Sequence, residues 1–222
     1  MDNITDRFKG STWHDNTVCR YITIGGAGSI SSWTALFLST TNKHQLVLVD
    51  FDKVEEHNVG GQFYKLDNVG EYKTSALKRL LYEFGSISEI SEFCSKIQDV
   101  EAAFDYCIAG FDNMEARKYL YEKWKRRVSR ELFIDARLTA EQYEIYFVTP
   151  ERQAEYEATL FDSKEAADTV CSYKTTKHFA AMCGAKIVHG LNCHLANKVI
   201  PGSYMLPFHY FEFGPTWTIQ TK

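Results

Sequence analysis

Short apolar runs alternate with amphipathic segments along the first half of the chain. Residues 18–24 are rich in β-branched and aromatic side chains, residues 30–39 repeat apolar side chains at helical spacing, and residues 45–50 form a second apolar run. This order predicts a strand, a helix and a second strand joined as one βαβ unit. The stretch "GGAGS" separates the first strand from the helix.

The same alternation continues to residue 128. The pattern predicts a helix over residues 73–83, short strands over residues 88–94 and 104–110, and a helix over residues 113–128. Strands that alternate with helices indicate a mostly parallel sheet with helices on both faces. We therefore predict an α/β fold of the Rossmann-like type.

The second half of the chain departs from this alternation. Residues 131–138 and 141–148 are predicted as two neighbouring strands that extend the sheet as an antiparallel pair. Residues 151–171 are charged and weakly periodic, which is typical of a mobile crossover segment. A helix over residues 176–198 and a final aromatic strand or arm over residues 204–219 complete the predicted order of elements.

Length and charge narrow the class of protein. The 222 residues, 45% of them hydrophobic, allow one large buried core, so we expect a single domain over residues 1–222 with a nucleotide-binding core over residues 18–125. Residues 126–222 then supply the sheet extension, the crossover segment and the C-terminal helix and arm. The 25 basic and 29 acidic residues give a net charge of -4, which argues against nucleic acid and anionic membranes as partners. No apolar run approaches the ~20 residues that span a bilayer and the N-terminus is polar, so we expect a cytoplasmic protein.

The glycine-rich stretch is a candidate phosphate site. Glycines between a strand and a helix suit phosphate because bare backbone approaches the ligand while the first N–H groups of the helix point at it. Gly26 and Gly28 take the first two positions of a G-x-G-x-x-G pattern, and Ser31 takes the third. On its own this pattern is equally typical of a simple tight turn. Asp50, at the end of the second strand, adds an acidic side chain where ribose hydroxyls are bound in such folds.

Four motifs in order extend this picture: "GAGSIS", "VDFDKVEEHNVGGQF", "VGEYKTSAL" and "AGFDNMEARKYL". Together they resemble the core of the ThiF, MoeB and E1 family of ubiquitin-like-protein-activating adenylyltransferases. The resemblance covers residues 18–125, with a looser similarity in the helix after Cys171. The "EEHNVGGQ" variant is also similar to ThiF-like proteins encoded by phages and mobile elements.

The resemblance implies an enzyme that uses ATP and Mg²⁺ to convert the C-terminal carboxylate of a small ubiquitin-like or β-grasp carrier protein into an acyl-adenylate. Such a reaction depends on charge neutralisation and in-line positioning. By the same resemblance the backbone of Gly26, Gly28 and Ser29 faces the phosphates, Asp50 holds the ribose, and Asp52 lies near the same edge of the nucleotide. The resemblance also implies a homodimer.

Four more side chains match family positions. Asn58 and Gln62 match an N-x-x-x-Q pair beside the triphosphate, Lys73 matches a lysine that pairs with phosphate oxygens, and Asp112 matches an aspartate that binds Mg²⁺. Simpler local roles stay open: Asp52 as a turn cap, Asn58 and Gln62 as partners of loop backbone, Lys73 as a solvated residue at a helix start, and Asp112 as the N-cap of the next helix.

The chain also departs from the family. Gly61 stands where members have an arginine that steadies the leaving phosphates. Arg7 is a candidate for an arginine donated across a dimer, and Arg137, at the end of "FIDAR", is a candidate that could point inward, although each is equally explained as a surface arginine. Cys171 matches the crossover cysteine that forms a thioester or persulfide in some members, and Lys174 nearby would favour its thiolate. A plain structural cysteine is the alternative.

Two other functions explain part of the sequence. An NAD(P)-dependent oxidoreductase accounts for the glycine turn and Asp50 but leaves Lys73 and Asp112 without a role. A non-catalytic scaffold accounts for Ser29 and Gly61. Binding of ATP·Mg²⁺ as against NAD⁺, followed by a test for pyrophosphate exchange, separates the three functions.

Overall fold

The computed structural model describes residues 6–11, 14, 20–41, 43–101, 104–138, 142–161, 177–196, 200 and 202–207. These residues form a seven-stranded sheet in the order β3-β2-β1-β4-β5-β6-β7. Strands β1 to β5 are parallel to one another, β6 is antiparallel to β5, and β7 is antiparallel to β6. The predicted Rossmann-like sheet with an antiparallel extension is therefore confirmed. The strands are β1 (Tyr21–Gly25), β2 (Gln45–Val49), β3 (Glu89–Phe93), β4 (Tyr106–Ala109), β5 (Leu132–Leu138), β6 (Gln142–Val148) and β7 (Ser203–Pro207).

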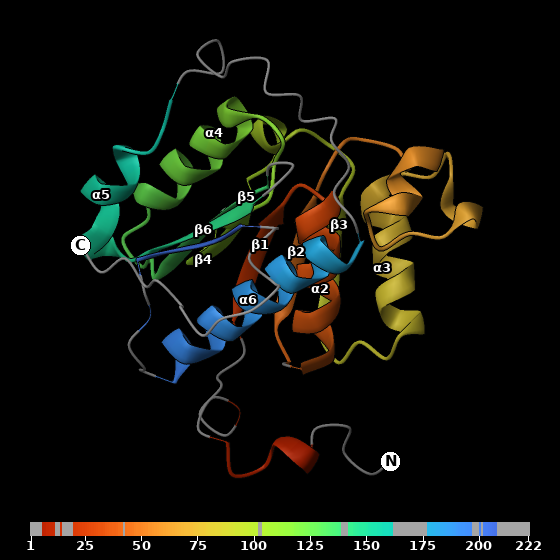
Figure 1. The fold of residues 1–222 in the computed structure, drawn as a ribbon, viewed down its shortest axis with the longest axis horizontal. Helices are drawn as coiled ribbons and strands as arrows, with labels where there is room; N and C mark the ends of the chain where they lie inside the picture. The colour runs from red at the N-terminus through yellow and green to blue at the C-terminus, as the bar shows by residue number, and fades with distance from the viewer. Residues whose placement is uncertain are drawn as a thin grey trace.

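Helices cover both faces of the sheet, as Figure 1 shows. One face carries α2, α3 and α6, and the other carries α4 and α5. The helices are α2 (Ser29–Thr41), α3 (Lys73–Glu83), α4 (Met114–Lys125), α5 (Gln153–Glu157) and α6 (Lys177–Leu195). Short 3₁₀ turns are η1 (Asp6–Phe8), η2 (Glu56–Gly60), η3 (Leu66–Asn68), η4 (Ile97–Asp99) and η5 (Pro150–Arg152).

Two apolar layers hold these elements together. On one face Ile22 and Ile24 of β1 pack with Leu38 of α2 and Ile187 of α6, and all four side chains are fully buried. Helices α2 and α6 approach closely because position 184 is glycine: a Cβ there would lie 2.9 Å from the backbone nitrogen of Thr34. The second layer lies between the sheet and α4. Its largest fully buried side chains are Trp124, Tyr121 and Phe133.

Most predicted boundaries agree with the structure to within a few residues. The helix over residues 73–83 has the bounds expected of it, whereas the helix predicted to residue 128 ends at Lys125. The crossover segment begins with ordered structure: η5 and α5 lie within it, and Tyr156 of α5 is 2% exposed. Strand β7 confirms a strand at the start of the predicted C-terminal arm, whose remainder lies outside the described residues.

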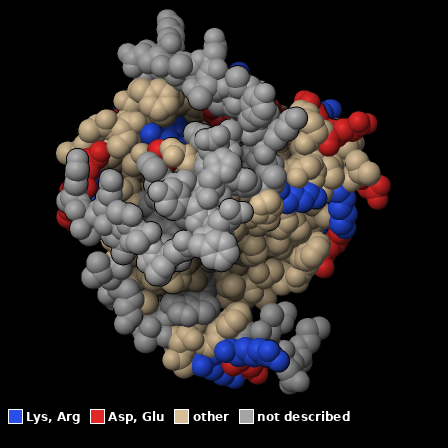
Figure 2. Space-filling model, viewed as in Figure 1, with Lys and Arg blue, Asp and Glu red and all other residues tan. Residues whose placement is uncertain are grey.

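The described surface shows mixed charge. In Figure 2 the visible Lys and Arg side chains lie beside Asp and Glu side chains at the rim of the molecule. Among the described helices, none combines the length and the apolar content needed to cross a bilayer.

The register of the parallel strands defines one edge of the sheet. Gly25 at the end of β1 pairs with Val49 of β2 and with Ala109 of β4, and Ala109 pairs with Asp135 of β5. Parallel strands place their carboxyl ends at the same edge, where α/β folds bind their ligands. We call this side the carboxyl edge and the opposite side the amino edge.

Candidate functional site

The turn between β1 and α2 is built for close approach of backbone. Gly26 has a φ of +81°, which favours glycine, and a Cβ there would lie 2.9 Å from the carbonyl oxygen of Gly110. A Cβ at Gly28 would meet no atom within 4 Å, so this side of the turn is open. Helix α2 starts at Ser29, and its first N–H groups have no acceptor within the helix. The turn therefore presents donors and open space to an anion.

Asp50 fastens this turn from the end of β2. Its Oδ2 accepts a hydrogen bond from the backbone nitrogen of Ala27 at 2.6 Å, and its Oδ1 accepts one from the backbone nitrogen of Asp52 at 2.8 Å. Burial raises the pKa of Asp50, and the positive charge of Lys73 and the two backbone hydrogen bonds oppose that shift. Asp50 thus lies beside the glycine turn as predicted, and its ribose contact stays a prediction.

Lys73 joins the same cluster from the first residue of α3. Its Nζ lies 2.8 Å from Oδ2 of Asp52, and the side chain is only 10% exposed. The Lys73 backbone nitrogen also donates to the carbonyl of Asp52 at 2.9 Å. The alternative of a solvated residue at a helix start is therefore wrong for Lys73. Asp52 holds the lysine in place, which is more than capping a turn.

Tyr64 lies between the glycine turn and the start of α3. Its hydroxyl lies 2.7 Å from the carbonyl oxygen of Ala27 and 3.2 Å from that of Lys73, and the residue is 3% exposed. Burial raises the pKa of Tyr64 well above its ordinary value, so the hydroxyl stays protonated and can donate. The glycine turn and the start of α3 are held at a fixed separation as a result.

Asn58 and Gln62 lie in the loop between β2 and α3. The Oδ1 of buried Asn58 accepts a hydrogen bond from the backbone nitrogen of Glu55 at 2.8 Å, so Asn58 has the local role that was its alternative. The Oε1 of Gln62 is buried and has no hydrogen-bond partner among the described residues. Gly61 between them accepts a hydrogen bond from Nε1 of Trp33 at 3.3 Å. Contacts of Asn58 and Gln62 with a triphosphate remain predictions.

Asp112 lies in the turn between β4 and α4. Its side chain is exposed, and its Oδ1 accepts a hydrogen bond from Nδ2 of Asn113 at 3.2 Å. The N-cap of α4 is Asn113, whose Oδ1 accepts from the backbone nitrogen of Ala116 at 2.8 Å, so the alternative of Asp112 as the cap is wrong. Asp112 therefore places an exposed carboxylate at the carboxyl edge and does not cap helix α4.

The two turns of the carboxyl edge pack on each other. The backbone nitrogen of Gly110 donates to the carbonyl of Gly25 at 2.9 Å. The ring of Phe111 fills the space where a Cβ of Gly25 would lie. Asp112 follows directly in the chain, so its position is tied to the glycine turn.

The two predicted arginines differ in their surroundings. Arg137 is 13% exposed, its Nε donates to Oδ2 of Asp135 at 2.8 Å, and its two Nη atoms each lie 3.0 Å from an oxygen of Thr159. Its guanidinium also lies 4.6 Å from the ring centroid of Tyr146. The alternative of a surface arginine is therefore wrong for Arg137. Its side chain points inward, and a contact with the leaving phosphates stays a prediction.

Arg7 does not join the cluster within one chain. It is exposed in η1, the red segment at the bottom of Figure 1, whereas α2 and α4 start near the top. A contribution across a dimer stays a prediction. Cys171 lies outside the described residues.

Together these residues fit ATP with Mg²⁺. The open space at Gly28 leaves room for a phosphate, and the exposed Asp112 carboxylate can bind a cation. The buried Gln62 oxygen accepts hydrogen bonds, so a hydroxyl or amino group of the nucleotide would satisfy it. A carboxylate with phosphate and water oxygens is the usual environment of Mg²⁺. The glycine turn and Lys73 would face the phosphates, and Asp112 would hold the metal.

Sequence reasoning missed the residues that support the site, namely Tyr64, Phe111, Arg117 and Asp135. Arg117 gave a signal, because it falls in the apolar stripe of its helix between Met114 and Leu120. Asp135 gave another, as a charge within the apolar run "LFIDARL".

Comparison with known proteins agrees with this geometry. The sequence pattern described as the ThiF family matches residues 17–212. The NEDD8-activating enzyme E1 catalytic subunit of Arabidopsis thaliana is 32% identical over 104 residues, which are 45% of this chain and 23% of that protein. Ubiquitin-like modifier-activating enzyme 5 of Culex quinquefasciatus is 27% identical over 113 residues, 43% of this chain and 28% of that protein. The chain thus spans a minor part of these relatives.

Solved structures share the fold. A structure of E. coli MccB with ATP has a TM-score of 0.70 at 16% identity, and the match covers 90% of this chain and 65% of that one. A structure of PaaA has a TM-score of 0.69 at 14% identity, with 93% of this chain and 66% of that one covered. At these identities the likeness concerns the fold.

Proposed function

Because this chain belongs to the ThiF family, we propose that it binds ATP with Mg²⁺ and adenylates the C-terminal carboxylate of a small carrier protein. One observation carries the proposal. The open glycine turn, Asp50, Lys73 and the Asp112 turn, which lie far apart in the sequence, meet at the carboxyl edge of one sheet. A dinucleotide site explains the first two of these features and leaves Lys73 and Asp112 unused.

The residues divide the work as follows. The N–H groups at the start of α2 bind phosphate oxygens, and Lys73 moves from Asp52 to the phosphates as a point charge. Asp112 holds Mg²⁺, which when bound supplies neutralisation of phosphate charge. A carboxylate oxygen of the carrier forms a bond to the α-phosphorus while the bond to the β-phosphate bridging oxygen breaks, so pyrophosphate leaves and no net proton moves. The chain contributes alignment and electrostatics, and no nucleophile.

The carrier and the assembly are part of the proposal. The relatives are named as a NEDD8-activating enzyme and a ubiquitin-like modifier-activating enzyme, and several solved MccB structures contain MccA. We infer a small β-grasp partner with a free C-terminal carboxylate, and a homodimer of single-domain chains in which Arg7 crosses to the partner and supplies the cation missing at Gly61.

Calorimetry with ATP, Mg²⁺ and NAD⁺ followed by pyrophosphate–ATP exchange tests the function. Lys73→Ala and Asp112→Ala should each lower exchange by about 10²-fold or more, since each removes charge stabilisation at the reacting phosphates. Lys65→Ala and Asp67→Ala make the same two changes at residues that are exposed in the loop before α3, and they serve as controls. Carriers to test are β-grasp proteins that end in Gly-Gly.

Three outcomes decide among the functions. Exchange that depends on Lys73 and Asp112 supports the adenylyltransferase. Binding of NAD⁺ and not ATP supports an oxidoreductase. ATP binding with no exchange for any carrier supports a scaffold.

A further inference from the structure

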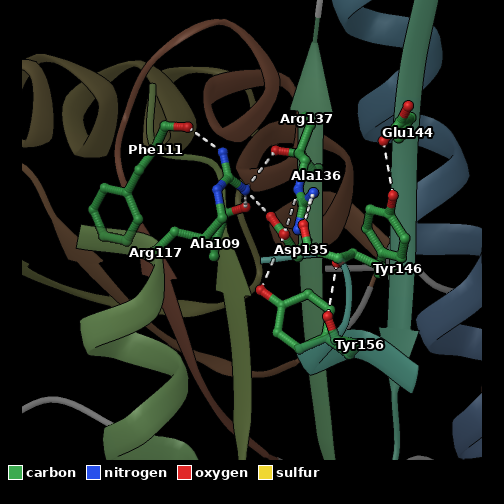
Figure 3. A network of polar contacts seen from close by, with 10 residues as sticks. Ala109, Phe111, Arg117, Asp135, Ala136, Arg137, Glu144, Tyr146 and Tyr156 are labelled. Carbon is green, nitrogen blue, oxygen red and sulfur yellow. Dashed lines mark hydrogen bonds and ion pairs between the residues drawn. The ribbon is translucent and has the colours of Figure 1, made fainter. Parts of the chain in front are cut away.

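A buried arginine lies directly behind the Asp112 turn. Arg117 of α4 is 5% exposed, and Figure 3 shows its guanidinium turned toward the ends of β4 and β5. Its Nη1 donates to the carbonyl of Ala136 at 3.1 Å and lies 3.4 Å from the carbonyl of Ala109, and its Nη2 donates to the carbonyl of Phe111. One side chain therefore joins the last residue of β4, the following turn and β5.

Asp135 is the buried carboxylate that pairs with this arginine. It is fully buried on β5, beside Ala109 in the sheet register, and forms an ion pair with Nη1 of Arg117. Its other oxygen, Oδ2, accepts hydrogen bonds from Nε of Arg137 at 2.8 Å and from the hydroxyl of Tyr156 at 3.0 Å (Figure 3). Asp135 is thus a single carboxylate between two guanidinium groups.

Two of the three carbonyls that Arg117 contacts, those of Ala109 and Phe111, lie on either side of Gly110, just before Asp112 in the chain. Phe111 packs on Gly25, and Gly110 donates to the carbonyl of Gly25, so a shift of this turn would disturb the glycine turn as well. Burial lowers the pKa of Arg117 to about 10, and the negative charge of Asp112 is among the groups that oppose this shift. Arg117 is thus tied by its backbone contacts to the turn that carries Asp112.

Arginine suits this place for a geometric reason. Its planar fork carries donors on three nitrogens in fixed directions, whereas the three donors of a lysine all lie on one nitrogen. A buried ion pair is a costly way to gain stability compared with apolar side chains of equal volume. A function in ordering the turn explains its presence better than stability alone.

We propose that Arg117, neutralised by Asp135, is a positioning residue that fixes the Asp112 turn against the glycine turn and so prepares Asp112 to bind Mg²⁺ with ATP. This inference rests on the proposed function. Arg117 touches neither nucleotide nor metal in this scheme and acts through the backbone of residues 109–111.

The test compares Arg117→Lys with Arg127→Lys in the full chain. Arg127 follows the same helix and forms an ion pair with Asp105 at the amino edge, so it is a matched control. Calorimetry measures ATP affinity with and without Mg²⁺, and hydrogen exchange of the ligand-free protein measures protection of residues 109–113. Mg²⁺ should raise the ATP affinity of Arg117→Lys about 10-fold less than it raises that of the wild type, an effect typical of residues that orient metal ligands. Hydrogen exchange over residues 109–113 should be faster in Arg117→Lys than in the wild type.

A double variant separates positioning from general destabilisation. If Arg117 acts through Asp112, then adding Arg117→Lys to Asp112→Asn should leave the remaining effect of Mg²⁺ on ATP affinity unchanged. A folded Arg117→Lys protein with wild-type Mg²⁺ dependence and wild-type protection of residues 109–113 overturns the inference. If Arg117→Lys does not fold, Tyr156→Phe, which removes one hydrogen bond to Asp135, should shift both readouts in the same direction by a smaller factor, and no shift overturns the inference.

The exchange measurement keeps this inference separate from the proposed function. A wild-type chain that does not bind ATP refutes the function and with it the role of Asp112 in binding Mg²⁺. Faster exchange in Arg117→Lys but not in Arg127→Lys would still show that Arg117 orders the turn.

Discussion

The two edges of the sheet use polar residues in opposite ways, although the same parallel strands supply both. At the carboxyl edge the buried charges are paired: Asp135 with Arg117, and Lys73 with Asp52. At the amino edge the buried group is neutral, because burial, and next the charge of Arg20, lower the pKa of His44 to about 4.

The ion pair of the amino edge is also different in kind. Arg127 and Asp105 lie 2.9 Å apart, but each side chain is more than one-third exposed. Water therefore solvates both charges, and such pairs contribute little to stability. Burying an ion pair has a large desolvation cost, and removal of one partner then strongly destabilises the fold because the other charge stays buried without compensation. This difference between buried and exposed ion pairs indicates that the charges of the carboxyl edge are held in place at some cost in stability, as expected where a ligand must bind.

The largest effect should come from breaking the buried pair. Asp135→Asn would leave the guanidinium groups of Arg117 and Arg137 buried without their shared carboxylate, and we expect a loss of about 3–5 kcal/mol in the free energy of unfolding. Urea unfolding measures the loss, with Asp105→Asn as the control at the amino edge. Equal losses for the two variants would remove the distinction between the edges.

Two glycines of one turn provide the next test. Gly26→Ala puts a Cβ at positive φ and close to the Gly110 carbonyl, so we expect a loss of about 2 kcal/mol or more. Gly28→Ala meets no atom within 4 Å and should change stability by less than about 0.5 kcal/mol, while its methyl group occupies the space proposed for phosphate and weakens ATP binding. Thermal unfolding and calorimetry on both variants check this contrast, which fails if Gly28→Ala binds ATP like the wild type.

The same contrast shows what the sequence could predict. Glycine spacing, apolar periodicity and the acidic residue at the end of β2 are local signals, so the glycine turn, α3 and Asp50 were placed correctly. Tyr64 was missed because a buried tyrosine that bridges two carbonyls looks like any other aromatic residue. Its role depends on loops that only the fold brings together.

The buried pair shows the limit more clearly. Arg117 and Asp135 are visible as charges in apolar segments, but their pairing depends on α4 lying over β4 and β5. Arg137 was predicted to point inward or to lie on the surface, and its contacts with Thr159 and Tyr146 depend on the fold. Thr159 comes from the segment predicted as a mobile crossover, which instead begins with an ordered helix.

Lowering the pH should destabilise the chain through His44 at the amino edge, by about 2 kcal/mol in the free energy of unfolding. The pKa of His44 in the folded chain, about 4, is below its ordinary value of 6.5, so between these values the unfolded chain binds the proton and the folded chain does not. The contribution of His44 to stability is therefore complete above pH 6.5 and is lost as the pH falls, by about 2 kcal/mol at pH 5. In His44→Asn this dependence should be absent. Unfolding curves of both proteins at pH 7.5 and pH 5 check it, and parallel losses in the two would rule it out.

The smallest effect should come from the exposed pair at the amino edge. Arg127→Gln removes the ion pair with Asp105, and we expect a loss below about 1 kcal/mol, because water replaces the lost partner. Salt should reduce even this loss, since exposed charges are screened. ATP affinity should not change, because Arg127 lies at the edge opposite the glycine turn. Urea unfolding at low and high salt and calorimetry with ATP measure these quantities. A loss of ATP affinity comparable with that of Arg117→Lys would mean that changes at either end of helix α4 weaken ATP binding. The proposed link between the carboxyl edge and the ATP site would then be wrong.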